Sequence, residues 1–533
     1  MKHRFTPLYI TLGVIAGILV GMFYSNHFTT NKLSVVSQGA NKVNDLLQLV
    51  DNHYVDTVDI ISLVDKALPS ILQELDPHSR YMSATEQEGE QEQLRGNFGG
   101  IGIQFSMPND TVNVMSLIHT GPSEKVGILP GDRIIMADTT NLVGMEDQEV
   151  MKHLKGELGT TVRLTILRHG QSEPLTFDVV RQTIPIVSVE ANYLMPDSTG
   201  YLRIKNFGEQ TYREMLTSLV NMQRVGMKKL IIDLRGNGGG YMETAVLMAN
   251  EFLEKGRLIV YTEGRKNPRK NYFSDGFGSF QHLPLVVLID EVSASASEIF
   301  AGAIQDNDRG TIIGRRSFGK GLVQQPISFP DGSCVRLTVA RYYTPSGRCI
   351  QKPYQYGHTE EYENDLLTRY ERGEFFSQDS IHFDGPEYKT SIGRVVYGGG
   401  GIMPDIFLPE DTTAVTSYYK EIVVSGLIRQ FTFQYTDANR QRLNEYSTIP
   451  EMLAYLRSQK ILEQFVRFAD EKGIKRRNSL IEKSRTLLER NVYGSIIYNA
   501  RDMQEYVQYI NMDDPTVLRA QEVLSDGSWR PKN

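Results

Sequence analysis

The sequence predicts a multidomain protein whose centre is an α/β layer with a partly parallel sheet, accompanied by a β-rich domain and by helical segments at both ends. Three observations predict this organisation. The 533 residues exceed what one hydrophobic core usually accommodates. Apolar strand patterns alternate with amphipathic helix patterns between residues 184 and 315. A glycine-rich stretch with short strand patterns precedes this region, and a long tail with helical spacing follows it.

Residues 1–30 are predicted to hold a cytoplasmic tip and an uncleaved membrane anchor. A basic tip precedes the apolar run Leu8–Tyr24, which is long enough for a helix across a hydrocarbon core of about 30 Å. A cleaved signal peptide is the alternative, but Phe23–Asn26 lacks the small residues of a cleavage site. Because a basic end stays in the cytoplasm, we expect a single-pass protein of the bacterial inner membrane with its remaining residues on the periplasmic side.

The composition excludes some classes of partner. A net charge of −7 shows no basic excess, so we do not expect nucleic acid to bind. The two cysteines, Cys334 and Cys349, are too few for a disulfide scaffold, and the sequence leaves open whether they are bridged or free. Gly13, Gly17 and Gly21 suit helix pairing as well as ordinary membrane packing, so a homo-oligomer is an open expectation.

Residues 41–95 are predicted to form an N-terminal helical segment. Apolar residues recur at helical spacing in two stretches that separate near Tyr54–Asp56. Asp76–Ser83 has the composition of a turn. The charged stretch Glu86–Gln93 is interpreted as a solvated surface.

Residues 96–182 change in character and predict a separate β-rich domain. They open with the glycine-rich strand Gly96–Phe105, continue through Gly121–Asp138 and end in a predicted hairpin. Successive glycines allow backbone N–H groups to converge on one anion. A dinucleotide loop is not expected here, because the glycines follow a charged helix and precede a strand, the reverse of the required order.

Residues 183–410 predict the α/β core, and residues 411–533 predict a helical C-terminal domain. Strand patterns begin at Gly200, Lys229 and Pro284, and the helix patterns between and after them are Gln210–Val225, Met242–Leu253 and Ser295–Asn307. Two further strand patterns around the pair Asp331-Gly332 predict a β-hairpin. The C-terminal domain carries no motif that predicts chemistry, so packing or oligomerisation is its expected role.

The central segment contains three serines at alternate positions, Ser293, Ser295 and Ser297, directly after a buried strand pattern. A serine at the start of a helix has backbone N–H groups and the positive helix end beside it, which suits a nucleophile. Ser295 fits this position. It also fits a helix cap, because Ser295 and Glu298 have the spacing of a capping box.

Two glycine-rich loops flank the serines. Gly238–Gly240 suits an oxyanion or a phosphate, but Tyr241 breaks the dinucleotide fingerprint. Gly314–Gly321 nearly matches a phosphate loop, but Gly321 replaces the required Ser or Thr. No histidine lies between positions 282 and 358, so a buried, neutral Lys320 is the candidate base, with Gln324 four residues later to orient it.

Three motifs together resemble the carboxyl-terminal processing (tail-specific) protease family: DLRGNGGG, then PLVVLIDEVSASASEIFAGAIQD, then GRRSFGKGLVQ. Members of this family are Ser–Lys peptidases with an inserted PDZ domain. The stretch GPSEKVGILPGDRI with its glycine-rich opening strand resembles that PDZ domain. The resemblance covers residues 41–410. It implies an α/β Ser–Lys protease core at 183–410 with the PDZ domain at 96–182.

The resemblance also implies roles for individual residues. The family spacing selects Ser295 as nucleophile, with Lys320 as base 25 residues later and Gln324 as its support. The implied oxyanion donors are the backbone N–H groups of Ala296 and Gly240. The residues implied to bind the carboxylate of a peptide tail are Gly99, Gly100, Ile101 and Gly102, and the implied link between tail binding and activation is Arg168.

The function implied is that of a membrane-anchored serine endopeptidase that cleaves proteins recognised by their accessible C-terminal tails. Neither a metal nor another cofactor is implied, and the membrane contact is the N-terminal helix. The alternative from another class is a catalytically silent, PDZ-containing scaffold. A nucleotide-binding enzyme that uses Gly314–Gly321 is a second alternative.

Overall fold

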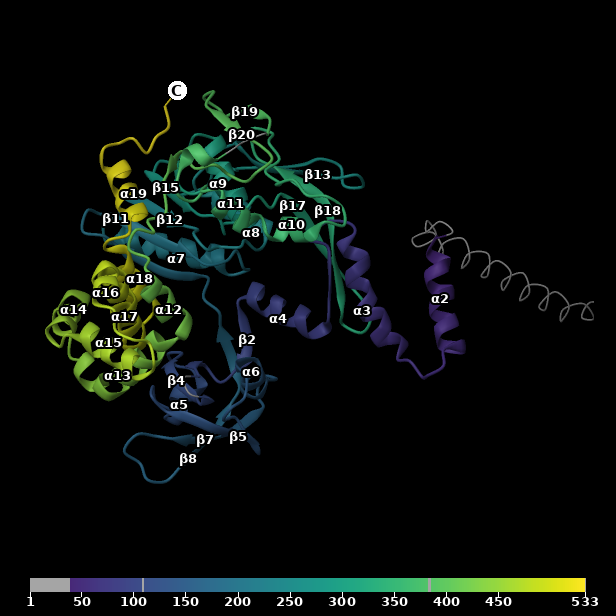
Figure 1. The fold of residues 1–533 in the computed structure, drawn as a ribbon. Coiled ribbons are helices and arrows are strands. Elements are labelled where there is room, and N and C mark those ends of the chain that lie inside the picture. Colours follow the sequence, from purple (N-terminus) through teal and green to yellow (C-terminus); the bar gives the residue numbers. More distant parts are fainter. Residues whose placement is uncertain (1–38, 108–109, 382–384, 533) are drawn as a thin grey trace, which may run out of the picture. The chain divides into compact units, whose positions relative to one another are not determined.

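A computed structural model describes residues 39–107, 110–381 and 385–532 (Figure 1). The predicted anchor at residues 1–30 lies outside these residues. Within the described ranges, no helix combines the length and the apolarity needed to cross a bilayer. The chain divides into two compact units, one ending at Leu72 and one beginning at Gln73.

The two N-terminal helices that the sequence predicts lie in the first unit, apart from the last residue of the second helix. Helix α2 spans Gly39–His53 and helix α3 spans Ile60–Gln73. The break between them is stabilised by Asp59, whose carboxylate accepts hydrogen bonds from the N–H groups of Ile61 and Ser62. Such a bond satisfies donors that the first turn of a helix leaves free.

The predicted β-rich domain contains a twisted sheet in the order β3-β4-β5-β7-β8, with β6 paired to β5. Along β7 the buried Val162, Leu164 and Ile166 alternate with more exposed residues, as expected for a sheet with one covered face. A separate pair, β2 (Asn97–Gly100) with β9 (Gln182–Pro185), joins the two ends of the domain. The remaining elements are β3 (Ile103–Ser106), β4 (Val112–Leu117), α5 (Pro122–Val126), β5 (Arg133–Ala137), β6 (Thr140–Asn141), α6 (Asp147–Leu154), β7 (Thr161–Leu167) and β8 (Leu175–Val180).

The predicted α/β layer is confirmed as a six-stranded sheet in the order β10-β11-β12-β15-β16-β21. All neighbouring strands are parallel except the antiparallel pair β10 and β11. The strands are β10 (Val189–Leu194), β11 (Thr199–Ile204), β12 (Lys229–Asp233), β15 (Leu285–Ile289), β16 (Thr311–Gly314) and β21 (Ile406–Phe407). Parallel neighbours place the loops after β12 and β15 at the same edge of the sheet.

Both faces of this sheet are covered, which explains why its strands are continuously apolar. Helices α7 (Thr211–Arg224), α8 (Met242–Asn250) and α9 (Ala296–Asp306) contribute to the core on one face. Residues of α18 (Met503–Asn511) and α19 (Pro515–Ser525) contribute to the core on the other face. The last two helices of the chain therefore complete the α/β core, although the sequence placed them in the C-terminal helical domain.

A second sheet is built on the predicted hairpin of β17 (Leu322–Ser328) and β18 (Cys334–Tyr343). Strand β18 also pairs with β1 (Arg80–Met82), which precedes the β-rich domain in the chain. Strands β13 (Leu258–Glu263) and β14 (Lys270–Phe273) extend the sheet. Helix α4 (Ala84–Arg95) follows β1 and begins with a capping box between Ser83 and Glu86.

The rest of the chain is short elements followed by helices, as the spacing predicts. Its elements are α10 (Thr359–Glu363), α11 (Asp365–Glu371), η2 (Gln378–Ser380), β19 (Glu387–Lys389), β20 (Val395–Tyr397), α12 (Ser417–Ser425), α13 (Leu427–Leu443), α14 (Ile449–Ser458), α15 (Ile461–Glu471), α16 (Asn478–Lys483) and α17 (Arg485–Ala500). Helices α12 to α17 share one hydrophobic core. Cys334 and Cys349 are both free thiols.

A buried ion pair fixes the C-terminal end of α9. Arg348 is fully buried and donates to the carboxylate of Asp306 and the side-chain oxygen of Gln305, each at 2.7 Å. Removing one partner of a buried ion pair leaves an uncompensated charge in a poorly hydrated site.

We therefore expect Arg348→Leu to lower the free energy of unfolding by about 3–5 kcal/mol, measured by denaturant unfolding. Arg163→Leu is the matched control, because Arg163 forms its ion pair with Asp178 in solvent and such pairs contribute little. Equal losses of stability in the two variants would contradict this assignment.

Candidate active site

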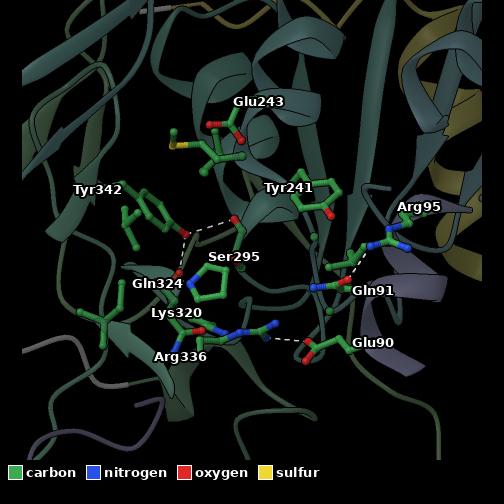
Figure 2. A pocket seen from close by; sticks show the side chains of 18 of the residues that line it. Glu90, Gln91, Arg95, Tyr241, Glu243, Ser295, Lys320, Gln324, Arg336 and Tyr342 are labelled. Carbon is green, nitrogen blue, oxygen red and sulfur yellow. Dashed lines mark hydrogen bonds and ion pairs between the residues drawn. The ribbon is translucent and has the colours of Figure 1, made fainter. Parts of the chain in front are cut away.

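The two sheets and α4 enclose a pocket of about 490 Å³ that contains several of the predicted site residues (Figure 2). Ser295 enters it from the start of α9, and Lys320 and Gln324 enter it at the start of β17. Gly240 lines it from the loop after β12. Residues that lie far apart in the sequence are thus brought to one cavity.

The backbone at Ser295 is strained in a way that presents this residue to the pocket. Its φ of 56° and ψ of −112° are unusual for a residue other than glycine, and such strain is commonly found at functional sites. Ser293 and Ser297 are fully buried, and their hydroxyls donate to the carbonyl oxygens of Leu234 and Asn237. Their bonds are structural, which leaves Ser295 as the serine that lines the cavity.

The fully buried carboxylate of Glu298 joins the backbones of the candidate nucleophile and the candidate base. Its Oε2 accepts from the N–H groups of Ser295 (2.8 Å) and Lys320 (2.9 Å). Its Oε1 accepts from the hydroxyl of Ser317 (2.6 Å) and the N–H of Gly319 (2.7 Å). Burial raises the pKa of Glu298 to about 7, although these four bonds oppose the rise. Only the ionised carboxylate can accept from four donors.

The hydrogen bonds to Glu298 bear on two alternatives that the sequence leaves open, a helix cap at Ser295 and a nucleotide site at Gly314–Gly321. The bond from the Ser295 N–H to Glu298 belongs to a helix cap, so the capping and nucleophile interpretations of Ser295 are compatible. The N–H groups of Gly319 and Lys320, which a phosphate would require, donate instead to the internal carboxylate of Glu298. This disfavours a nucleotide site at Gly314–Gly321.

Tyr342 on β18 provides a second bridge between the same two residues. Its hydroxyl lies 3.1 Å from the carbonyl oxygen of Ser295 and 2.5 Å from that of Lys320 (Figure 2). The hydroxyl has one proton, which these two acceptors share. Tyr342 and Glu298 together restrict how far the two backbone segments can move apart.

The electrostatic surroundings of Lys320 favour its neutral form. Burial is the main cause that lowers the pKa of Lys320 to about 8, and the positive charges of Arg336 and Arg80 lower it further. Glu90 and Glu298 act in the opposite direction. A lysine with such a pKa is partly neutral near neutral pH and can accept a proton.

The glycine loop after β12 approaches the start of α9 closely. A Cβ atom on Gly239 would lie 3.0 Å from the amide nitrogen of Ala296, so the loop and that N–H group are neighbours. Gly240 has a φ of 148°, and a Cβ there would lie 2.3 Å from the carbonyl oxygen of Phe207. The N–H of Gly239 donates to the side chain of Asn237, which fixes the loop. Glycine is therefore required at both positions.

The loop is also connected to the last helix of the chain. Arg235 donates to the buried carboxylate of Asp233 and, at 3.0 Å, to Asp514 at the start of α19. The N–H of Gly236 donates to Asp290 in the loop before Ser295. The glycine loop is therefore bonded both to α19 and to the loop that precedes Ser295.

Helix α4 corrects one interpretation from the sequence. The sequence interprets Glu86–Gln93 as a solvated surface, and Glu86, Glu88, Gly89 and Gln93 are indeed exposed. The other face of this helix lines the pocket, through Gln87, Glu90 and Gln91 (Figure 2). Glu90 forms ion pairs with Arg80 (2.8 Å) and Arg336 (2.6 Å). The pocket residues of this helix are Gln87, Glu90, Gln91, Leu94 and Arg95. The capping box at Ser83 was the sequence signal for an ordered helix here.

The residues predicted to bind a peptide tail lie at a second, smaller cavity of about 80 Å³ in the β-rich domain. Gly100, Ile101 and Gly102 line it together with apolar side chains of β3 and α6. Gly99 is adjacent, and its carbonyl oxygen accepts from the N–H of Gly156. The size and apolar lining suit one apolar side chain beside backbone N–H groups.

Arg168 and Lys155 occupy different positions relative to this cavity. Arg168 donates to the buried carboxylate of Asp132 at 2.7 Å and to the carbonyl oxygen of Gly127, both within the β-rich domain. Lys155 lines the cavity and donates to Glu92 of α4 at 2.6 Å. Lys155, which the sequence did not single out, thus connects the tail cavity to the helix at the larger pocket.

Comparisons with known proteins agree with this organisation. The model of peptidase family S41 matches residues 198–361, that of the PDZ domain matches 99–179, and that of a family of unknown function, DUF8443, matches 418–502. The carboxy-terminal-processing protease of Bartonella bacilliformis is 37% identical over 345 residues, covering 63% of this chain and 79% of that protein. The carboxy-terminal processing protease CtpA of Bacillus subtilis is 32% identical over 357 residues, covering 66% of this chain and 76% of that protein.

Among solved structures, the photosystem II D1 C-terminal processing protease aligns with 71% of this chain and 95% of its own, at 26% identity and a TM-score of 0.34. The α/β core, the PDZ domain and the helical C-terminal region define a serine-type peptidase that carries a peptide-binding module. The chain belongs to the carboxy-terminal processing proteases of peptidase family S41.

We expect Glu298→Gln to lower kcat by about 100-fold, because the amide group loses two of the four acceptor positions and the alignment of Ser295 with Lys320 relaxes. Peptide cleavage measures the loss, and circular dichroism verifies the fold. Glu291→Gln is the control. Glu291 lies in the loop before Ser295, but its carboxylate pairs with Arg315 and not with the backbone of Ser295 or Lys320. A full kcat in Glu298→Gln would contradict the proposed role of the carboxylate.

Proposed function

We propose that the chain is a membrane-anchored endopeptidase that cleaves proteins presented by their C-terminal tails, with Ser295 as nucleophile and Lys320 as general base. The observation that carries the proposal is that both residues line one pocket while their N–H groups bind the same carboxylate oxygen of Glu298. The lowered pKa of Lys320 supports its role as a base. Gln324, which lines the same pocket, supports Lys320.

The proposed reaction is acyl transfer to water. Neutral Lys320 takes the proton of the Ser295 hydroxyl while Oγ attacks a peptide carbonyl carbon. The N–H groups of Ala296 and Gly240 stabilise the oxyanion that forms. The Lys320 ammonium then protonates the leaving amine, and the peptide bond breaks to give an acyl-enzyme. Lys320 next takes a proton from water, whose oxygen attacks the ester carbonyl carbon. The bond between that carbon and Ser295 Oγ then breaks, the acyl product leaves as a carboxylic acid, and the Lys320 ammonium returns its proton to Oγ.

The PDZ domain supplies the proposed recognition of substrate. Backbone N–H groups of the stretch Gly99–Gly102 would receive the terminal carboxylate of an unfolded tail, and the adjacent apolar cavity would hold its last side chain. The tail would thereby be held while another part of the same chain reaches Ser295. Arg168 is the proposed link between tail binding and activation, as the family resemblance implies.

The proposed location follows from the sequence of the first 30 residues. An anchor at Leu8–Tyr24 would place the catalytic part on the periplasmic side of a bacterial inner membrane. Self-association through the anchor is compatible with its glycine spacing. A silent scaffold with a PDZ domain would bind the same tails without cleaving them, so cleavage by the described part of the chain separates the two functions.

We expect Ser295→Ala and Lys320→Ala each to lower kcat by at least about 1,000-fold, because one removes the nucleophile and the other the base. Cleavage of an unfolded protein with an apolar C-terminus measures this, and thermal unfolding verifies that both variants fold. Wild-type rates in either variant would refute the proposed dyad. Binding of the tail without cleavage by the unmodified chain would support the scaffold instead.

The rate should depend on pH with a defined sign. Because the pKa of Lys320 is lowered to about 8, about one tenth of this lysine is neutral at pH 7 and about nine tenths at pH 9. We expect kcat/KM to rise about tenfold across this interval. Below pH 7 protonation of Glu298 steepens the fall, since its pKa is about 7. A profile that stays flat from about pH 6 to 9 would exclude a lysine base with this pKa.

A further inference from the structure

The turn Asp76–Ser79 lies before the PDZ domain in the chain and is attached to strand β18 of the protease core. Asp76 is buried, and its Oδ1 accepts from the N–H groups of His78 (2.9 Å) and Ser79 (3.0 Å). The same oxygen accepts from the hydroxyl of Thr338 at 3.0 Å, and Ser79 Oγ accepts from the N–H of Thr338 at 3.1 Å. These four hydrogen bonds fix a short turn within the stretch Asp76–Ser83, which the sequence predicts to be a turn.

Thr338 is also the partner of Gln324 in the ladder between β17 and β18. The side-chain amide nitrogen of Gln324 donates to the backbone carbonyl oxygen of His78. A carbonyl oxygen can accept only from the NH₂ end of an amide. This contact therefore fixes the orientation of the Gln324 side chain, and it leaves the amide oxygen as the group that can accept from a lysine N–H.

The side chain of His78 packs against Tyr362 and remains neutral. Its Nε2 lies 2.7 Å from the hydroxyl of Tyr362, and the two rings meet edge to face with centroids 5.1 Å apart. Burial, followed by the positive charge of Lys320, lowers the pKa of His78 to about 3. The imidazole thus adds no charge beside the lysine at working pH, although the two side chains are close enough for the charge of Lys320 to act on His78.

Charged and titratable groups face Lys320 from several elements. They are His78 on the turn, Arg80 on β1, Glu90 on α4, Glu298 on α9 and Arg336 on β18.

We propose that the Asp76–Ser79 turn is a positioning element for the general base: Asp76 fixes the turn on β18, and the His78 carbonyl oxygen orients Gln324 toward Lys320. The inference rests on the proposed function of Lys320. Asp76 and His78 act through Gln324 and do not touch the reacting atoms.

A double-mutant cycle tests whether Asp76 acts through Gln324. We expect Asp76→Ala to lower kcat by about 10- to 100-fold with KM changed less than about twofold, because the base loses its alignment while the tail site is intact. In a Gln324→Ala background the same substitution should lower kcat by less than about twofold further. Losses that multiply would overturn the proposal, because they would show that Asp76 acts independently of Gln324.

The pH profile provides a second readout that general destabilisation does not move. Loosening the turn admits water to Lys320, so the pKa of the lysine rises toward its ordinary value and the midpoint of the kcat/KM profile moves to higher pH in Asp76→Ala. Asp331→Ala is the control, because Asp331 fixes the β17–β18 turn through Ser333 and is exposed. An unchanged midpoint in Asp76→Ala would contradict the proposal.

Two further measurements keep the outcomes distinct. Ser79→Ala removes the hydroxyl that accepts from the N–H of Thr338 and donates to Asp76, while the Asp76 carboxylate stays in place. It replaces Asp76→Ala if that variant does not fold, with smaller effects of the same sign expected. Activity retained in Lys320→Ala would show that the proposed function itself is wrong. Loss of activity in Lys320→Ala together with independent effects of Asp76 and Gln324 would overturn the positioning role alone.

Discussion

The arrangement of the site depends on one buried carboxylate. The Glu298 carboxylate accepts hydrogen bonds from the N–H of Ser295, the residue that caps α9, and from the loop that carries Lys320. With the Ser317 hydroxyl, its two oxygens accept four hydrogen bonds. Burial makes this charge costly, and four short hydrogen bonds offset the cost. Moving either backbone segment would break a hydrogen bond to this buried charge, so few alternative geometries are accessible. Ser295 and Lys320 lie on separate segments, and this restriction keeps them aligned.

The remainder of the core supports this contact from a distance. Parallel pairing of β12 with β15 places the glycine loop beside Ser295. Arg235 connects that loop to Asp514 of α19, so a helix at the end of the chain stabilises a loop near its middle. Helix α4 approaches the pocket from the other side, where Glu90 holds Arg80 and Arg336 near the lysine. The positive charges in turn help to lower the pKa of Lys320.

The sequence predicts those features that depend on local pattern. Continuous apolar runs predict the strands of the α/β sheet, and the resemblance to the protease family selects Ser295, Lys320 and Gln324. The sequence does not predict that α4 lines the pocket. Glu90 on this helix binds Arg336, which lies 246 positions later, and no local pattern indicates such a distant partner. For the same reason the contact between His78 and Gln324 was not anticipated, and an amphipathic pattern could not show that α18 and α19 cover the sheet.

The distance between Ser295 Oγ and Lys320 Nζ, in a crystal structure with a peptide tail bound to the PDZ domain, tests the central claim most directly. Direct proton transfer requires the two atoms to lie about 2.6–3.2 Å apart. The account predicts a separation in this range, with the Gln324 amide oxygen turned toward the lysine and its nitrogen on the carbonyl oxygen of His78. A separation beyond about 5 Å with the tail in place, or another residue within hydrogen-bonding reach of Oγ, would contradict it.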